Sequence, residues 1–427
     1  MTTFKIPRAL GAGTLVLAAL GACQASPAVQ PMASQGGGLQ LKATAQLPVG
    51  QGPHGIAAAQ GFVYNADTGA GQISVIDTRT QAVVTTLPLP DGTPGYLKAF
   101  HDGRHVLGAD TKRGELWVID PAQGHRVVQR IPAGTGVDKL VIDTDDRRVW
   151  VSLTGEPRIL ELTFAADRSQ APTRRSYEVG GVAGDQFKHR ALAVEAGWLV
   201  APNSADNDVS LINLATAAAQ RVAGGNTPGP VGLGVAGEVA VAAIVGFKAS
   251  NAITLFELPG GTPHRLDDVG LTPADVGVDP TLGRAYVTMS GSNEVAVVDY
   301  VGKRLVGRVP VGKRPVHLYM APALPAGSPA PGAVASAGPA AAGGHANGDG
   351  HAHYQLTDHP MPTLTHEWWV GNDDGGSVTV FDGETLRVKA TIATGAGHHK
   401  LAFSGTFAYV SNLTDSTVSV VDRATIE

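Results

Sequence analysis

Histidine is the residue type in this chain whose number and spacing point to a chemical role. The 427 residues contain 14 His but a single Cys. Five of the His stand within one stretch of 22 residues, namely His345, His351, His353, His359 and His366. Because neutral imidazoles are ligands for zinc, copper and nickel, this stretch is a candidate metal-binding loop.

A second group of His opens short apolar runs that recur along the chain. Eight such openings align as Pro53-His54-Gly55, Pro94-Gly95-Tyr96, Val137-Asp138-Lys139, Lys188-His189-Arg190, Pro230-Val231-Gly232, Pro273-Ala274-Asp275, Pro315-Val316-His317 and His398-His399-Lys400. Four of the eight contain His. If the openings converge, His54, His189, His317, His398 and His399 form a second metal site, with Asp138 and Asp275 as oxygen ligands.

Each His group has a simpler interpretation. Pro-His-Gly is a common tripeptide in such repeats, where the imidazole hydrogen-bonds to a neighbouring strand or to water. The His-rich stretch could equally be a solvent-exposed loop whose histidines bind nothing.

The element that must bring the openings together is a repeated unit. A short alternating strand, usually ending in an acid or an amide, recurs at Asp77, Asp120, Asn213, Glu257, Asp299, Asp382 and Asp422, with a degenerate copy at Thr163. Successive copies are 43, 43, 50, 44, 42, 83 and 40 residues apart. This is the spacing of β-propeller blades, so we predict an all-β, eight-bladed propeller with four-stranded blades, seven blades being the alternative.

The first strand of each blade lines the central channel of a propeller, so the aligned openings would surround one end of it, which we call the channel mouth. The eighth unit stops at Glu427 without its outer strand. Residues 41–50 near the N-terminus repeat the register of Val388–Ile392. We therefore expect the N-terminal strand to complete the last blade and remove the exposed sheet edges.

Second-strand segments such as Tyr409-Val410-Ser411-Asn412, Tyr286-Val287-Thr288-Met289 and Val63-Tyr64-Asn65 resemble those of YVTN-repeat propellers. The resemblance covers residues 39–427, but blades three to five depart from the repeat pattern. The resemblance therefore supports the fold strongly and a function only weakly. More weakly, an exported eight-bladed propeller with a His-rich segment is similar to the periplasmic zinc chaperones that serve zinc importers, which implies zinc as cargo.

The N-terminus predicts export and lipid attachment. Residues 1–22 combine Lys5 and Arg8 with a short apolar run, as a signal peptide does, and Leu20-Gly21-Ala22-Cys23 resembles the bacterial lipobox. Cys23 would carry the lipid. We predict a flexible tether at 23–38, a single propeller at 39–427, and within it a disordered insertion at 321–365.

Charge and motifs limit the function. The net charge of −5 becomes −7 once Lys5 and Arg8 are removed, which argues against nucleic acid as a partner. We expect a monomer, anchored by its lipid on the periplasmic or outer-membrane side, with an envelope protein as a second type of partner.

An enzyme is not expected. Covalent catalysis has no support, because there is no Gly-x-Ser-x-Gly elbow and the sole Cys is assigned to lipid. A lactonase-like or redox activity stays open, with Glu195, Asp138 and Asp275 as channel acids.

The sequence therefore predicts a ligand-binding protein, with zinc or copper as the leading ligand and no other cofactor. A protein-interaction or adhesion scaffold without metal is the alternative. A third is a tetrapyrrole-binding propeller with His54 or His189 as ligand, although no Cys-x-x-Cys-His motif accompanies it.

Overall fold

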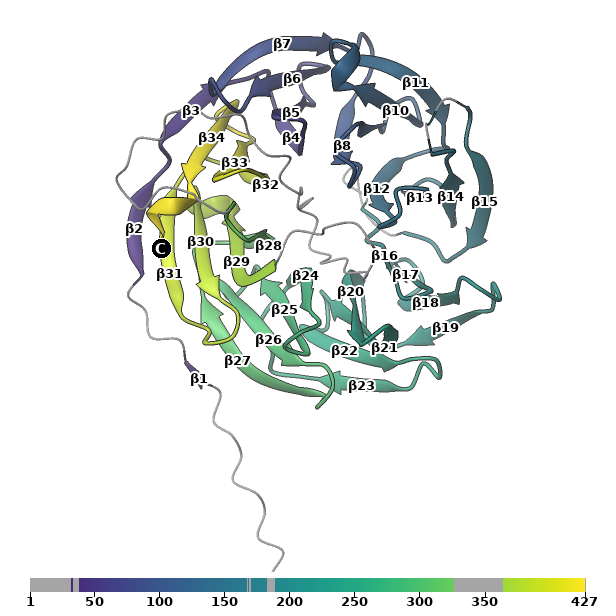
Figure 1. Cartoon of the computed structure of the whole chain (residues 1–427). Coiled ribbons are helices and arrows are strands. Elements are labelled where there is room, and N and C mark those ends of the chain that lie inside the picture. The colour runs from purple at the N-terminus through teal and green to yellow at the C-terminus, as the bar shows by residue number, and fades with distance from the viewer. Residues whose placement is uncertain are drawn as a thin grey trace, which may run out of the picture. The chain divides into compact units, whose positions relative to one another are not determined.

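The computed structural model describes residues 32–33, 38–166, 168, 170–182, 189–325 and 364–426. These residues form eight sheets arranged in a ring around a central channel, as Figure 1 shows. Apart from the strands there are three 3-10 turns, η1 (Pro121–Gln123), η2 (Asp373–Gly375) and η3 (Arg423–Thr425). No helix in this part of the chain is long and apolar enough to cross a membrane.

Every blade has four strands, numbered outward from the channel. Blades one to four consist of β4 (Pro53–Ala59), β5 (Phe62–Asp67), β6 (Gln72–Asp77), β7 (Ala82–Pro88); β8 (Pro94–Ala99), β9 (Val106–Asp110), β10 (Glu115–Asp120), β11 (Arg126–Pro132); β12 (Val137–Ile142), β13 (Arg148–Leu153), β14 (Arg158–Thr163), β15 (Thr173–Glu178); and β16 (Ala193–Glu195), β17 (Trp198–Asn203), β18 (Asp208–Asn213), β19 (Ala219–Ala223).

Blades five to eight follow the same plan. They consist of β20 (Pro228–Ala236), β21 (Val239–Phe247), β22 (Ala252–Glu257), β23 (Pro263–Leu266); β24 (Pro273–Asp279), β25 (Arg284–Met289), β26 (Glu294–Asp299), β27 (Arg304–Pro310); β28 (Pro315–Pro322), β29 (Leu364–Asn372), β30 (Ser377–Asp382), β31 (Val388–Ala393); and β32 (His398–Ser404), β33 (Phe407–Asn412), β34 (Thr417–Asp422), β3 (Ala45–Pro48).

The predicted eight-bladed propeller is confirmed. Each of the eight alternating segments is the third strand of a blade, and each ends at the residue that the sequence pattern singled out, from Asp77 in β6 to Asp422 in β34. The terminal acid or amide caps the following turn: Asp77, for example, accepts hydrogen bonds from the backbone N–H groups of Arg79 and Thr80. The repeat thus marks strand and turn together.

The N-terminal strand closes the ring, as predicted. Strand β3 pairs antiparallel with β34, with Ala45 opposite Val420 and Pro48 opposite Thr417. The segment before it continues around the outside. Strand β2 (Leu39–Lys42) adds a parallel fifth strand to β31 of blade seven, and β1 (Met32–Ala33) pairs parallel with β27 of blade six. In Figure 1, β2 and β3 follow the outer edge of the ring.

The long insertion lies between the first and second strands of blade seven. Strand β28 ends at Pro322 and β29 begins at Leu364, and a hydrogen bond of 3.0 Å joins Thr365 Oγ1 to the carbonyl oxygen of Ala321 where the two strands meet. This end of the blade is opposite the one where β28 opens at Pro315. Residues 326–363, most of the predicted insertion, lie outside the described residues.

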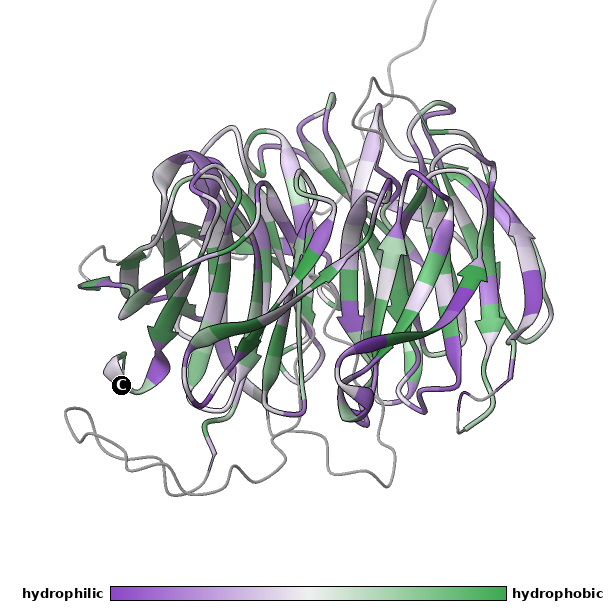
Figure 2. Cartoon of the chain, turned by 90° about the horizontal axis from the view of Figure 1, so that it is seen from above, coloured by the Kyte–Doolittle hydropathy of each residue, from purple (hydrophilic) through white to green (hydrophobic). Residues whose placement is uncertain are grey.

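The hydrophobic core is divided into eight clusters, one between each pair of neighbouring blades. Alternate residues of a strand point to opposite faces of its blade, so Ile56 and Ala58 pack toward blade eight while Ala57 and Ala59 pack toward blade two. Figure 2 shows the apolar strands between polar loops at both ends. Each blade therefore depends on both neighbours for the burial of its two faces.

Small residues let the first strands approach one another near the axis. A Cβ at Gly55 would lie 2.2 Å from the carbonyl oxygen of Gly95 in the next blade. A Cβ at Gly277 would lie 2.3 Å from the ring of Trp368. Any larger side chain at either position would push two blades apart.

We predict that deleting residues 39–50, which removes β2 and β3, lowers the free energy of unfolding by at least about 3 kcal/mol. Leu41 and Leu47, both partly buried, pack on the cores of blades seven and eight, and the deletion also removes the pairing of β3 with β34; full burial of one such side chain is worth roughly 1.5–3 kcal/mol. Urea unfolding followed by tryptophan fluorescence measures the change. Deleting residues 31–34, which removes only β1, is the control and should change it little; equal effects would show that β3 does not close the ring.

Candidate binding site at the channel mouth

A register shift interrupts the first strand of seven blades at its opening. The shifts lie between Pro53 and Ile56, Pro94 and Leu97, Val137 and Leu140, Pro228 and Val231, Pro273 and Asp275, Pro315 and His317, and His398 and Lys400. Blades five and seven have a second shift further along the strand. A bulge re-aims the residues it contains. Seven of the aligned openings are the starts of innermost strands at one end of the ring, whereas His189 and Arg190 precede β16, which begins at Ala193.

Buried hydroxyl groups hold these bulges in place. Ser152 Oγ accepts the N–H of Lys139 at 2.9 Å and donates to the carbonyl oxygen of Arg190 in the next blade at 3.0 Å. The same bridge joins blade six to blade seven through Thr288 Oγ1. In blade eight, Ser411 Oγ accepts the N–H of Lys400, and its one hydrogen is within reach of the carbonyl oxygen of Lys400 at 3.1 Å and of His54 in blade one at 3.4 Å. One hydroxyl thus fixes the opening of its own blade and of the next.

His54 lies at the mouth with a defined tautomer. Its Nδ1 is 3.2 Å from the carbonyl oxygen of Gly95, and because a carbonyl can only accept, Nδ1 carries the hydrogen. The ring meets Tyr96 edge-on at 5.3 Å between centroids. Burial, followed by the charge of Lys400, lowers the pKa of His54 to about 4, so the imidazole is neutral at pH 7 and its Nε2 carries the lone pair.

His189 lies within reach of the charge of His54. Its Nδ1 is 3.1 Å from Oδ1 of Asp138, and the other oxygen of that carboxylate accepts the N–H of Arg190 at 2.6 Å. His189 and Asp138 both act on the pKa of His54, the first lowering it and the second raising it. Asp138 therefore orients His189. That His54, His189 and Asp138 bind one metal ion stays a prediction.

His317 and Asp275 form a separate pair across blades six and seven. His317 Nδ1 is 3.6 Å from Asp275 Oδ2, and that oxygen also accepts the N–H of Leu318 at 3.3 Å. At 3.6 Å the carboxylate of Asp275 lies beside the imidazole of His317 without the hydrogen bond that joins Asp138 and His189.

Several predicted site residues lie outside what the structure describes. Strand β32 contains His398 and His399, but their side chains are not among the described ones. The same holds for Cys23 and for four residues of the His-rich stretch, His345, His351, His353 and His359.

His366, which we predicted to end the His-rich stretch as a loop ligand, belongs to strand β29. Its Nδ1 lies 2.6 Å from Oδ2 of the buried Asp279 in blade six. This pair is at the end of β24 away from the mouth. Among the residues described, no group of three or more His, Cys, Asp or Glu side chains is arranged to hold a metal ion.

The mouth also holds residues that the choice of histidines missed. The ring of Tyr96 has two ammonium groups near it, with Lys400 Nζ 4.6 Å and Lys139 Nζ 4.9 Å from its centroid. Lys400 reaches it from blade eight, past Gly55 of blade one. All three residues occupy the third position of the aligned openings, so the alignment contained the signal.

A third lysine comes from the second strand of blade five. Lys248 follows β21, and a Cβ added to Gly229 would lie 2.7 Å from its Cε, so its side chain lies over the opening of β20. Desolvation by the surrounding protein, followed by the charge of Lys139, lowers the pKa of Lys248. The mouth is therefore rich in positive charge within a chain of net charge −5.

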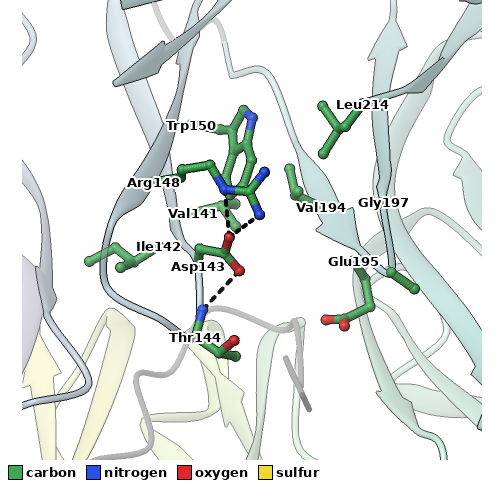
Figure 3. Close-up of a pocket in the computed structure, with 11 residues that line it drawn as sticks. Val141, Ile142, Asp143, Thr144, Arg148, Trp150, Val194, Glu195, Gly197 and Leu214 are labelled. Atoms are coloured by element: carbon green, nitrogen blue, oxygen red, sulfur yellow. Dashed lines mark hydrogen bonds and ion pairs between the residues drawn. The ribbon is translucent and has the colours of Figure 1, made fainter. Parts of the chain in front are cut away.

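A pocket of about 340 Å³, including space open to solvent, lies between blades three and four at the opposite end of these strands (Figure 3). Its centre is occupied by Arg148, whose Nε donates to Asp143 at 2.8 Å and whose guanidinium lies 5.0 Å from the ring of Trp150. The pocket shares no residue with the mouth. Its main charged pair is satisfied internally, so we assign it no ligand.

Comparisons with known proteins support the fold. No family model and no curated protein sequence matches this chain. Sqt1 of Saccharomyces cerevisiae is similar in structure, with a TM-score of 0.63 at 9% identity over 90% of this chain and 99% of that one. Hydrazine synthase of Kuenenia stuttgartiensis gives a TM-score of 0.51 at 15% identity over 90% and 98%. Similarity at these identities shows a β-propeller and no particular activity.

We predict that acid destabilises the protein through His54. With a folded-state pKa of about 4 and an unfolded value of 6.5, the unfolded chain binds the extra proton between these values. Stability should therefore fall by up to about 3 kcal/mol as the pH drops from 6.5 through 4. Urea unfolding at pH 7.5 and 4.5 should show a smaller loss in His54→Gln, whose amide can still donate to Gly95. An equal loss of stability at pH 4.5 in the unaltered protein and in His54→Gln would contradict the buried, neutral state of His54.

A second prediction concerns the hydroxyl bridges. Ser152→Ala would leave a buried N–H and a buried carbonyl without their partner, which costs about 1–3 kcal/mol. Thermal unfolding should show a clear loss for this variant and almost none for Thr80→Ala, which changes an exposed turn residue. Similar small losses in both would mean that the bridge does not hold the mouth together.

Proposed function

We propose that this chain is an exported, lipid-anchored binding protein that takes a transition metal, zinc or copper, at the channel mouth. The observation that supports this is the hydrogen bond from His54 Nδ1 to Gly95, which leaves Nε2 as a lone-pair nitrogen. Imidazoles that bind metals usually donate their other N–H to a backbone carbonyl or a carboxylate. His54 has the first arrangement.

His189 follows the second arrangement, because its Nδ1 is 3.1 Å from Oδ1 of Asp138 and the carboxylate orients the neutral ring. Nδ1 of His317 is 3.6 Å from Asp275, a contact without a hydrogen bond. We take His54 and His189 as the first two candidate ligands, because each has its Nδ1 hydrogen directed to an oxygen acceptor of a neighbouring blade. The third comes from His398 or His399, in the first strand of the blade next to His54.

Zinc titration of the compact unit Pro31–Glu427 tests the proposal. We expect one tight site, which His54→Ala weakens at least about tenfold, because even partners of metal ligands contribute a factor of 10–100 to affinity. The matched control is His264→Ala, an exposed histidine on the outer strand β23, which should bind zinc like the unaltered protein.

A variant lacking residues 340–360 separates the mouth from the His-rich stretch, because the deletion removes four histidines and leaves β29 intact. Zinc binding that survives the deletion and is weakened by His54→Ala supports the mouth as the site. Loss of zinc binding in the deletion variant would show that the site lies in the His-rich stretch. No binding in any variant would contradict metal binding and favour a protein-interaction scaffold.

A further inference from the structure

Four blades have the same irregularity in their outer strand. In blades one, two, six and seven the outer strand has one extra residue opposite the third strand, a bulge at Val84, Val128, Val306 and Lys389. The outer strands of the other four blades pair without such a shift. We call the four residues after each bulge the outer stretch, namely Thr85–Pro88, Gln129–Pro132, Gly307–Pro310 and Ala390–Ala393.

In two of these blades the outer stretch accepts a further strand from the N-terminal part of the chain. Leu39 of β2 pairs with Ala390, the first residue of the stretch in blade seven. Met32 of β1 pairs with Gly307, the first residue of the stretch in blade six. Both added strands are parallel to the outer strand. Because the two additions begin at the same position, the bulge sets the register of a fifth strand.

The outer stretch of blade one directs the same backbone groups outward. The N–H of Leu89, directly after β7, donates to the carbonyl oxygen that precedes β6. Since such pairs alternate along antiparallel strands, Pro88 turns its carbonyl oxygen away from β6, and Thr86 turns both its N–H and its carbonyl oxygen away. The equivalent of Pro88 in blade seven is Ala393, whose carbonyl oxygen accepts the N–H of Ala43 at 2.9 Å. Blade one therefore has the backbone groups that hold β2 on blade seven.

Side chains already occupy the outer stretch of blade two. Arg174 of blade three donates to the carbonyl oxygen of Pro132 at 2.5 Å, and Pro132 is the equivalent of Pro88. Arg130 forms an ion pair with Glu115 at 2.6 Å. A strand added to blade two would have to break the bond from Arg174.

Blade one is open at this position. Among the described residues, no strand and no side chain bonds to the outer edge of β7, which ends its sheet (Figure 1). The strand has no charged residue, and Val83 and Val84 are 36% and 50% exposed. Its half-buried Leu87 is the equivalent of Ile392, which β2 covers with Leu41. An uncharged edge strand with exposed apolar side chains is a template for another strand.

We propose that the outer edge of blade one binds an extended segment of a partner protein, which adds a parallel fifth strand at Thr85–Pro88. In this mode of recognition, main-chain hydrogen bonds give affinity and alternate side chains give specificity. The inference goes beyond the proposed function and depends on neither metal nor lipid.

Strand β2 indicates the chemistry of the segment. A Cβ at Gly38 would lie 2.8 Å from the backbone of the bulge residue Lys389, so the strand needs Gly where it passes the bulge. Apolar residues then alternate, as in Leu39-Gln40-Leu41, and Leu41 packs on the blade core. We therefore expect the partner segment to contain a Gly followed by apolar residues at alternate positions.

A fluorescein-labelled peptide with the sequence of residues 37–44, GGLQLKAT, is the probe. It is titrated with the unit Pro31–Glu427 and followed by fluorescence anisotropy. We expect one saturable site with a Kd of roughly 1 mM or tighter, because only a short stretch pairs. A peptide of the same composition in the order TKGQLLGA, without alternate apolar residues, should bind about fivefold or more weakly.

Thr86→Pro is the variant that tests the edge. It removes the outward N–H and leaves the hydrogen bonds to β6 intact, and proline is tolerated on the open side of an edge strand. Peptide binding should weaken about fivefold or more, while the thermal unfolding midpoint stays unchanged. Thr86→Ala keeps the N–H and is the matched control, which should bind the peptide like the unaltered protein.

A modified peptide keeps the test open if Thr86→Pro fails to fold. N-methylation of the alanine that corresponds to Ala43 removes the donor for the carbonyl oxygen of Pro88. This peptide should bind the unaltered protein about fivefold or more weakly than the unmodified peptide.

Lack of peptide binding, or equal binding of the reordered peptide, would overturn the inference. Unchanged binding to a folded Thr86→Pro variant would also overturn it, and would show that the peptide replaces β2 on blade seven. Self-association of the unit that Thr86→Pro abolishes, without peptide binding, would assign the edge to a second copy instead of a partner protein. Zinc plays no part in these measurements, so either proposal can fail alone.

Discussion

Closure between the first and last blades is the constraint on which the rest of the molecule depends. Each blade buries both faces, so seven interfaces are not enough, and the eighth requires Ile56 and Val63 of blade one to pack against Tyr409 and Val420 of blade eight. Strand β3 adds Leu47 to this cluster. Because each cluster contains residues of two blades, an error at any one interface exposes apolar surface on both.

The same closure makes the mouth. Seven bulged openings and two hydroxyl bridges give the first strands a common geometry, so residues far apart in the chain meet across the channel. Lys400 of blade eight lies near Tyr96 of blade two, and Gly55 of blade one lets the first strands of blades one and two approach closely. A rigid ring thus holds charged side chains that would otherwise separate, which is the usual way in which a scaffold preorganises a site.

The fold was predictable from local patterns, because each third strand and its capping turn, such as Gln72–Asp77 with its Asp-capped loop, are encoded within a few residues. The completing strand was visible from the repeated register of residues 41–50. The site was less predictable. The partners of His54 and His189 depend on bulges and on the ring's diameter, and Lys248 lies on a second strand that the alignment of openings did not include. Assigning His366 to the loop was natural, because its partner Asp279 is 87 residues earlier.

The strand pairing that completes blade eight also affects the order in which the blades can fold. Thr44 Oγ1 donates a hydrogen bond to the carbonyl oxygen of Val420, 376 residues later in the chain. Strand β3 is therefore synthesised long before its partner β34. Contacts between residues so far apart in the sequence form slowly, because closing such a long loop costs chain entropy before the contact contributes any stabilisation. Until blade eight has been made, strand β3 has no partner and the ring cannot close. The chain therefore reaches its native state only after almost all of the propeller is present.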